Sequence, residues 1–329
     1  MAREVRQPGC IRQTFLPIQL PMDNLTHSLI GAALGQAGLK RKTGLAMPAL
    51  IIAANLPDID AGCAIYGIES LSMRRGITHG PIALLVLPVL LAGAIWWFDR
   101  WQKRRGKRPE GRLPLHFGWL LGLCYIGALT HPLFDWFNNY GIRLLEPFSS
   151  QWFYGDTLFI IDPWIIAMLG AGIWFSLRQE RADAVNWKQP ARNGIGAMGA
   201  FVAINLLISW AALTVARGDA PYAEVNVSNA VPIAFWQREV LWRTSDGHFG
   251  RMDCSLIRCD RYPLGMTPTN MSDPRIAEWS KNDPAAEAFL FWSRMPVAEL
   301  HDDRIILRDQ RFMNPLTKDQ FSVTLKPKK

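Results

Sequence analysis

Four long apolar runs constrain the fold of this chain more than any other feature of its sequence. They cover residues 80–98, 115–134, 158–177 and 194–216. About 20 apolar residues in a helix span the hydrocarbon of a bilayer. Two weaker runs, 25–39 and 44–56, precede them and predict tilted, short or half-inserted helices. The sequence therefore predicts a helical membrane domain over residues 22–216.

Beyond residue 217 the pattern changes to short alternations of apolar and polar residues. Examples lie at 222–227, 304–307 and 320–325. Such alternation is typical of half-buried strands, and Asp-Gly and Asn-Pro turns separate these segments. We therefore expect a mainly α protein, in which a polytopic helical membrane domain is followed by a small β-rich extracytoplasmic domain over residues 217–329.

The basic residues indicate how the chain crosses the membrane. The formal net charge of +8 would alone suggest a nucleic-acid partner. Its excess, however, is concentrated in short loops such as 99–114, and Lys and Arg in such loops mark the cytoplasmic side. The loop 136–157 has Arg143 as its only basic residue and is expected outside the cytoplasm. We expect a multi-pass protein of the inner membrane, with the lipid bilayer and not nucleic acid as its partner.

The first 21 residues do not fit this topology. Arg3, Arg6 and Arg12 would have to cross the membrane, and no apolar core of a signal peptide accompanies them. Met22 is therefore the expected start of the native protein, which leaves residues 1–21 as an N-terminal extension that is not translated. N-terminal sequencing of the native protein tests this.

The cysteines show no metal-type spacing. Cys254 and Cys259 lie five apart in the β-rich part. They could form a disulfide if that part lies outside the cytoplasm, although spacing alone does not define the geometry of a bridge.

Polar motifs beside the apolar runs carry the candidate chemistry. They are Thr26-His27, 55–60, 75–79 and 131–135. Under the topology above, all of them lie at the outer face of the membrane. His131 and Asp135 are four apart on a predicted helix, so one face carries both and they can hold one cation. The motifs predict a site for a divalent metal.

Each motif also has a plainer interpretation. His131 alone fits a hydrogen-bonded packing residue, and Thr26 fits a helix cap. Pro57 can simply end a helix before two solvated acids. In an extended segment, however, Asp58 and Asp60 would point the same way, as a metal or a bridging pair requires. The histidines make the motif specific.

In order along the chain, these motifs resemble the YdjM family of membrane-bound, predicted metal-dependent hydrolases. The resemblance covers Met22 to Leu177, and its pattern of His, Asp and His at helix ends is similar to that of zinc-dependent phospholipase C. It implies a helical metal site with the ligands His27, Asp58, Asp60, His79, His131 and Asp135. Many relatives have His-Arg-Gly where this chain has Arg74-Arg75-Gly76, which leaves the number of metals open.

We therefore expect an enzyme, a metal-dependent hydrolase that acts on an ester or phosphoester of a lipid or envelope component through a metal-activated water. Asp58 and Asp60 are the candidate catalytic carboxylates, because either can ligate, bridge metals or act as general base. Arg74 and Arg75 are expected to hold substrate charge. Zinc suits this ligand set best, and manganese or magnesium is also compatible. Supporting contacts to the ligands are expected from Thr26, Thr78, Asn138 and Asp162.

The alternative is a non-enzymatic membrane transport or scaffold protein with a structural cation site. Transporters usually place charged groups near the middle of the membrane and contain repeated halves. The charged groups here gather at one face, and no repeat is visible. The enzyme is therefore the preferred hypothesis.

Overall fold

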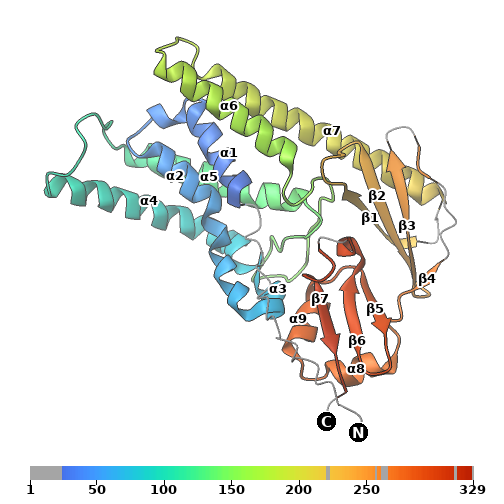
Figure 1. Cartoon of the computed structure of the whole chain (residues 1–329). Helices are drawn as coiled ribbons and strands as arrows, with labels where there is room; N and C mark the ends of the chain where they lie inside the picture. Colours follow the sequence, from blue (N-terminus) through green and yellow to red (C-terminus); the bar gives the residue numbers. More distant parts are fainter. Residues whose placement is uncertain (1–23, 220–222, 256–257, 261–265, 315–316, 328–329) are drawn as a thin grey trace, which may run out of the picture.

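The structure is a computed structural model that describes residues 24–219, 223–255, 258–260, 266–314 and 317–327. The predicted extension 1–21 and the predicted start at Met22 lie outside the described residues. A mainly helical part is followed by two antiparallel sheets, which confirms the expected mainly α protein with a β-rich part after its helices (Figure 1). The placement of the β-rich part outside the cytoplasm stays a prediction.

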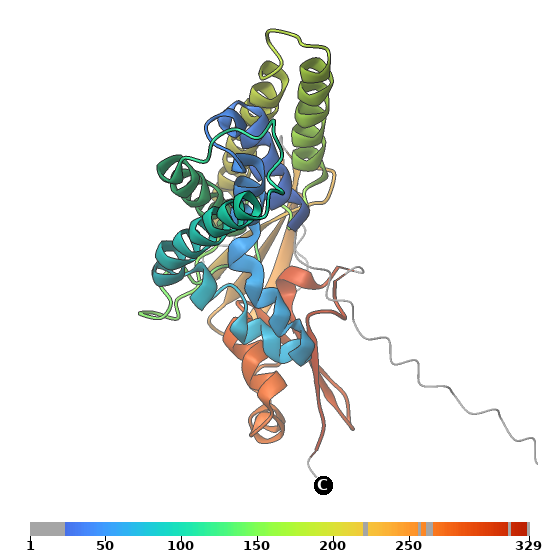
Figure 2. The same ribbon diagram turned by 90° about the vertical axis from the view of Figure 1, so that its left-hand side faces the viewer.

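The helical part runs from α1 to α7. Its elements are α1 (Asn24–Gln36), η1 (Leu39–Arg41), α2 (Ala46–Asn55), η2 (Leu56–Glu69), α3 (Ser70–Met73), η3 (Ile77–His79), α4 (Pro81–Arg104), α5 (Phe117–Phe137), α6 (Pro163–Arg181) and α7 (Gln189–Asp219). Helices α6 and α7 lie side by side at one edge (Figure 2).

Within the described residues, four segments are long and apolar enough to cross a membrane. They are Ala46–Met73, Pro81–Arg104, Phe117–Phe137 and Gln189–Gly218. Three of them correspond to the predicted runs 80–98, 115–134 and 194–216. The fourth, Ala46–Met73, contains most of the weaker predicted run 44–56. The predicted run 158–177 is not among the four segments: it forms α6, which begins at Pro163 after the cap Asp162 and has Arg178, Glu180 and Arg181 in its last turn.

Close packing of α1, α2 and α5 places the polar motifs at one end of the helices. A Cβ atom at Gly31 of α1 would lie 2.7 Å from the backbone oxygen of Leu50 on α2, and one at Gly127 of α5 would lie 2.8 Å from the same oxygen. Small residues at such positions let helix backbones approach closely in a membrane. The consequence is that His27, the residues after α2 and His131 meet at the same level.

The turn before α4 is equally tight, which gives a prediction about stability. A Cβ atom at Gly80 would overlap the backbone oxygen of Glu146. We expect Gly80→Ala to destabilise the protein by about 3 kcal/mol, because the backbone must shift to relieve the overlap. Gly93→Ala is the matched control, since no atom lies within 4 Å of a Cβ there. Thermal melting in detergent measures both, and equal melting temperatures for the two variants would contradict the expected overlap.

The β-rich part contains two sheets. The four-stranded sheet has the order β1 (Ala223–Ala230), β2 (Gln237–Thr244), β3 (His248–Ser255) and β4 (Thr267–Pro268), and the three-stranded sheet has the order β5 (Pro296–Leu300), β6 (Ile305–Asp309) and β7 (Ser322–Leu325). Helices α8 (Pro274–Ser280) and α9 (Pro284–Trp292) and the short η4 (Gln310–Phe312) complete it. Cys254 and Cys259 form a disulfide beside β3.

The second sheet shares its core with the helical part. Trp292 of α9 is fully buried and packs against Tyr140, with 5.1 Å between ring centroids. Phe312 and Leu71 belong to the same cluster of buried residues. Tyr140 lies in the loop after α5, so the β-rich part is packed onto the loop that adjoins the polar motifs. Both sheets lie at the end of the helices opposite the α4–α5 connection (Figure 1).

Candidate metal centre

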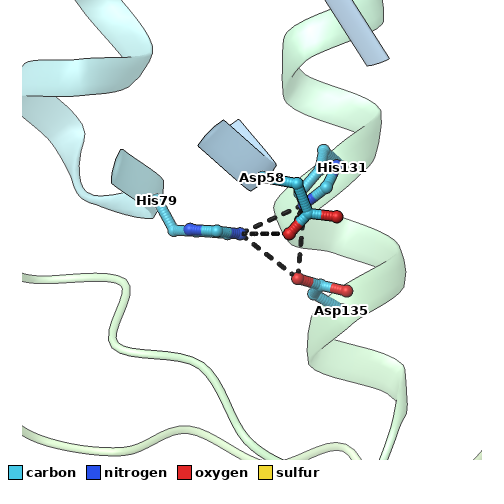
Figure 3. Close-up of side chains that lie close together, drawn as sticks. All are labelled: Asp58, His79, His131 and Asp135. Carbon is cyan, nitrogen blue, oxygen red and sulfur yellow. Dashed lines mark hydrogen bonds and ion pairs between the residues drawn. The ribbon is translucent and has the colours of Figure 1, made fainter. Parts of the chain in front are cut away.

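Four buried side chains converge where the polar motifs meet, and they can hold a metal ion: Asp58, His79, His131 and Asp135 (Figure 3). One ligand atom from each lies within 4.8 Å of all the others. The Nε2 atoms of His79 and His131 are 3.1 Å apart. Asp135 Oδ2 lies 3.3 Å from the first of these nitrogens and 3.4 Å from the second. Asp58 Oδ1 lies 3.5 Å from His131 Nε2.

The far nitrogen of each imidazole is held in place. His131 Nδ1 lies 2.7 Å from the backbone oxygen of Ala54, which can only accept a hydrogen bond, so Nδ1 carries the proton. His79 Nδ1 lies 2.9 Å from Thr78 Oγ1 and 3.4 Å from Asp60 Oδ2. Both rings therefore direct the lone pair of Nε2 into the group. This arrangement is typical of histidines that bind metals.

The residues present fit a divalent metal ion. The Nε2 atoms of His79 and His131 are 3.1 Å apart, and both present a lone pair next to two carboxylates. Neither nitrogen therefore has a proton to donate to the other. Asp135 Oδ2 has no hydrogen-bond donor within the part of the chain that the structure describes. Arg75 pairs with the other oxygen, Asp135 Oδ1, so a cation bound by all four side chains would offset the remaining cost of burying two carboxylates together.

Asp58 and Asp60 do not point the same way. The segment that holds them is the 3-10 helix η2, not an extended strand. At about three residues per turn, residues two apart face different directions. Asp58 therefore joins the four-residue group, while Asp60 lies behind His79 and accepts hydrogen bonds from Thr78 Oγ1 and Arg75 N, both at 2.8 Å. Thr78 thus contacts both Asp60 and His79.

This placement distinguishes the two carboxylates by experiment. We expect Asp58→Asn to abolish stoichiometric metal binding, because it replaces a negatively charged carboxylate ligand with a neutral amide. Asp60→Asn should weaken metal affinity only about 10–100-fold, the usual effect of changing a group that orients a ligand. Metal titration of the two detergent-purified variants measures the difference. Equal losses would mean that Asp60 is itself a ligand.

His27 lies beside the four-residue group. Its Nε2 is 3.5 Å from Asp135 Oδ1, and its ring stacks on that of His131 with 3.8 Å between centroids. His27 Nδ1 has no hydrogen-bond partner among the described residues. Thr26, next to it on α1, is also buried. His27 thus contacts the oxygen of Asp135 that faces away from the His79–His131 pair.

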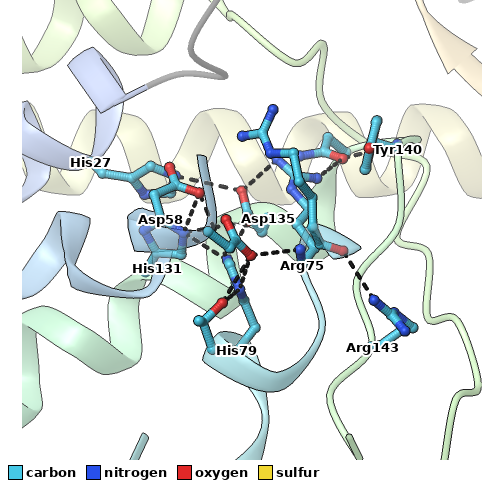
Figure 4. Close-up of polar contacts among 12 residues, drawn as sticks. His27, Asp58, Arg75, His79, His131, Asp135, Tyr140 and Arg143 are labelled. Atoms are coloured by element: carbon cyan, nitrogen blue, oxygen red, sulfur yellow. Dashed lines mark hydrogen bonds and ion pairs between the residues drawn. The ribbon is translucent and has the colours of Figure 1, made fainter. Parts of the chain in front are cut away.

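Arg75 fixes the position of Asp135. Its guanidinium, in a residue 1% exposed, donates to Asp135 Oδ1 at 2.7 Å and to Asn138 Oδ1 at 2.9 Å (Figure 4). It also lies 4.8 Å from the ring centroid of Tyr140. The backbone of Arg75 is left-handed, with φ 53°, a conformation that costs an L-residue about 1–2 kcal/mol. A guanidinium with this many partners is suited to orienting Asp135 more than to holding substrate.

Arg74 is placed differently. It is only 4% exposed, yet its Nε and Nη2 atoms have no hydrogen-bond partner among the described residues. Two donors of a buried cation are thus available for an anion. Asp162, in contrast, is engaged as the cap of α6, where it accepts from Trp164 N at 2.9 Å.

Sequence reasoning missed two supports of the site. The Arg75 guanidinium lies over the ring face of Tyr140, and the backbone oxygen of Ala54 accepts a hydrogen bond that orients the His131 ring. Tyr140 was visible in the loop 136–157, but no sequence pattern assigned it a cationic partner. A backbone carbonyl leaves no signal in a sequence.

These observations define a multi-pass membrane protein with a buried Asp, His, His and Asp group that can bind a metal. The chain belongs to the YdjM inner membrane protein family, whose sequence model matches residues 22–216. The resemblance drawn from the motifs is thereby confirmed.

A further comparison gives a relative without an assigned activity. The chain is 30% identical over 170 residues to the uncharacterized protein YfhP of Bacillus subtilis (strain 168), an alignment that covers 47% of this chain and 47% of YfhP. The chain thus matches about half the length of this curated relative. No solved structure matches the chain.

Proposed function

We propose that the protein is a membrane-bound metal-dependent hydrolase that acts on an ester or phosphoester of a lipid or envelope component. The observation that carries this proposal is the pair of Nε2 atoms of His79 and His131, 3.1 Å apart beside two carboxylates. A divalent ion held by Asp58, His79, His131 and Asp135 would supply Lewis acidity and an activated water. Zinc suits the imidazoles, and manganese or magnesium suits the carboxylates.

The chain supplies the other requirements of phosphoester hydrolysis nearby. Arg74 offers two unpartnered donors for phosphoryl oxygens, which are acceptors that guanidinium groups bind well. Asp60 Oδ1 also has no hydrogen-bond partner among the described residues, so this oxygen is the one we assign to accept a proton. Arg75 keeps Asp135 in position. His27, on the other oxygen of Asp135, would be a ligand only if a second ion binds.

We further propose that the centre and the β-rich part face outside the cytoplasm. The two sheets lie at the end of the helices opposite the basic α4–α5 connection (Figure 1). The Cys254–Cys259 disulfide fits an oxidising compartment. A reporter fused after Lys329 tests the orientation, and activity of that reporter only in the cytoplasm would overturn it.

Metal removal tests the hydrolase proposal. We expect chelation of the detergent-purified protein to abolish hydrolysis of bis(4-nitrophenyl) phosphate, and zinc or manganese to restore it. Metal that restores thermal stability without any hydrolysis would instead favour the alternative, a transport or scaffold protein with a structural cation site. That alternative draws on the deep burial of all four side chains, which a purely structural ion would also require.

A further inference from the structure

A cleft of about 680 Å³ lies in the β-rich part, next to the loop after α5. Its walls come from the end of β1, the start of β2, the end of β3 and the η4 segment, and from Asn139, Phe159 and Ile160 of the helical part. Cavities of 300–1,000 Å³ are typical of small-molecule sites. The cleft is thus large enough for a small-molecule ligand and is formed by both parts of the chain.

The cleft adjoins the candidate metal centre. Phe159 and Ile160 line the cleft and also line a second, narrow space of about 10 Å³. That space reaches His27 and Asp135. Phe159 and Ile160 thus belong both to the wall of the cleft and to the wall of the narrow space beside Asp135.

The charges that line the cleft balance one another. Three arginines face three carboxylates: Arg238, Arg258 and Arg311 against Glu239, Asp253 and Asp260. Four of the six pair with an opposite charge, and for Glu239 the partner is Arg251 at 3.2 Å. Arg258 lies 3.1 Å from Asp260, and Arg311 lies 2.8 Å from Asp309 behind the wall. Such a lining offers no net charge with which to select an ionic ligand.

The uncharged lining favours a hydroxylated ligand. Four side-chain amides line the cleft: Asn139, Asn229, Gln237 and Asn314. An amide both donates and accepts hydrogen bonds, as a hydroxyl group does. Phe159 and Phe312 add aromatic surface against which the C–H groups of a sugar ring or a glycerol can pack.

We propose that this cleft binds an uncharged, polyhydroxylated group, glycosyl-like or glycerol-like, of a substrate whose phosphoester lies at the metal centre beyond Phe159 and Ile160. This inference rests on the proposed hydrolase function. It assigns recognition of the substrate to the β-rich part and chemistry to the helical part. The hydrogen bond from Asn139 Nδ2 to Asn229 Oδ1 at 2.8 Å joins the two parts at the cleft, and the bond from Asn229 Nδ2 to the backbone oxygen of Arg311 at 2.9 Å joins β1 to η4.

Binding of two phosphate esters that differ only in the hydroxylated group tests the inference. We expect the full-length, metal-loaded protein in detergent to bind glucose 1-phosphate at least about 10-fold more tightly than methyl phosphate in calorimetric titrations. Ala230→Trp should reduce this preference to about two-fold or less by filling the cleft, while methyl phosphate still binds. Gln237→Trp, at an exposed position of the same cleft, should reduce the preference in the same way. It tests the cleft independently if Ala230→Trp does not fold.

Ala223→Trp is the matched control, because Ala223 lies at the other end of β1 and away from the cleft. This control variant should keep the preference for glucose 1-phosphate over methyl phosphate. Equal binding of both esters to the unaltered protein, or a preference that persists in both cleft variants, would overturn the inference. Hydrolysis of bis(4-nitrophenyl) phosphate is measured in parallel. Selective binding without any hydrolysis would contradict the hydrolase proposal alone, and hydrolysis without selective binding would contradict the cleft proposal alone.

Discussion

Replacing both His79 and His131 with Ala should reduce bound metal from a stoichiometric amount to background. It should also lower the rate of phosphodiester hydrolysis by about 1,000-fold or more, equivalent to about 4 kcal/mol of transition-state stabilisation. The physical reason is that the two Nε2 atoms are the only imidazole donors of the four-residue group. Elemental analysis of the purified protein and the rate with bis(4-nitrophenyl) phosphate measure the two effects.

The matched control for this experiment is the His248→Ala, His301→Ala double variant. Both histidines lie in the β-rich part, outside the four-residue group. The control should keep both metal and activity. If the His79, His131 variant folds and retains stoichiometric metal, the ion is bound elsewhere and the assignment of the centre is wrong.

The second large effect is expected at the buried ion pair of Asp309 and Arg311. The two charged groups are 2.8 Å apart, and both side chains are fully buried. Arg311 Nη1 also donates to the backbone oxygen of Asn139 at 2.7 Å, which ties η4 to the loop after α5. Asp309→Asn leaves a buried guanidinium without its counter-charge. We expect a loss of about 3–5 kcal/mol of stability, measured by denaturant unfolding and tryptophan fluorescence.

The Asp309–Arg311 ion pair also predicts that the stability of the protein depends on pH. Burial alone would raise the pKa of Asp309, but the charge and hydrogen bonds of Arg311 outweigh it and hold that pKa below the ordinary value. The stabilisation is therefore complete above the pKa of the unfolded carboxyl, about 4, and is lost as the pH falls through the lower, folded pKa. Unfolding of the unaltered protein should become easier over that acidic range, and Asp309→Asn should remove this part of the dependence.

Asp303→Asn is the control for both experiments. Asp303 pairs with Arg304 at 3.5 Å, but its side chain is 74% exposed. Exposed pairs contribute little to stability, so this variant should unfold like the unaltered protein. If Asp309→Asn lowered the stability as little as Asp303→Asn, the contact between η4 and the loop after α5 would not depend on the buried pair.

The sequence predicted the helical part, and the four residues that converge in the structure are among its candidate ligands. The length of the apolar runs indicated three of the four candidate spans, and the four-residue spacing of His131 and Asp135 placed both on one helix face. Spacing could not show which of Asp58 and Asp60 points into the four-residue group, because the directions of their side chains depend on whether the segment is extended or a 3-10 helix. The residues after Pro57 form a 3-10 helix, which turns Asp60 behind His79.

The supporting contacts were harder to predict, because they join residues far apart in the chain. Arg75 was expected to meet a substrate, and its neighbours Asp135 and Asn138 come from another helix and its following loop. Nothing in the pattern around residue 75 indicates a left-handed backbone that turns the guanidinium inward. The cleft depends likewise on how β1–β3 dock against the helical part, and alternation within strands carries no information on docking.

The order of the elements along the chain has a consequence for biosynthesis. All four candidate ligands precede residue 136, whereas Trp292 and Phe312, which pack on Tyr140, are synthesised after them. A nascent chain can therefore assemble its ligand group while the β-rich part is still unmade. An ion held by this group would be loaded during membrane insertion, and metal scarcity during translation would leave η2, η3 and α5 without a shared ion before the β-rich part packs against the helices.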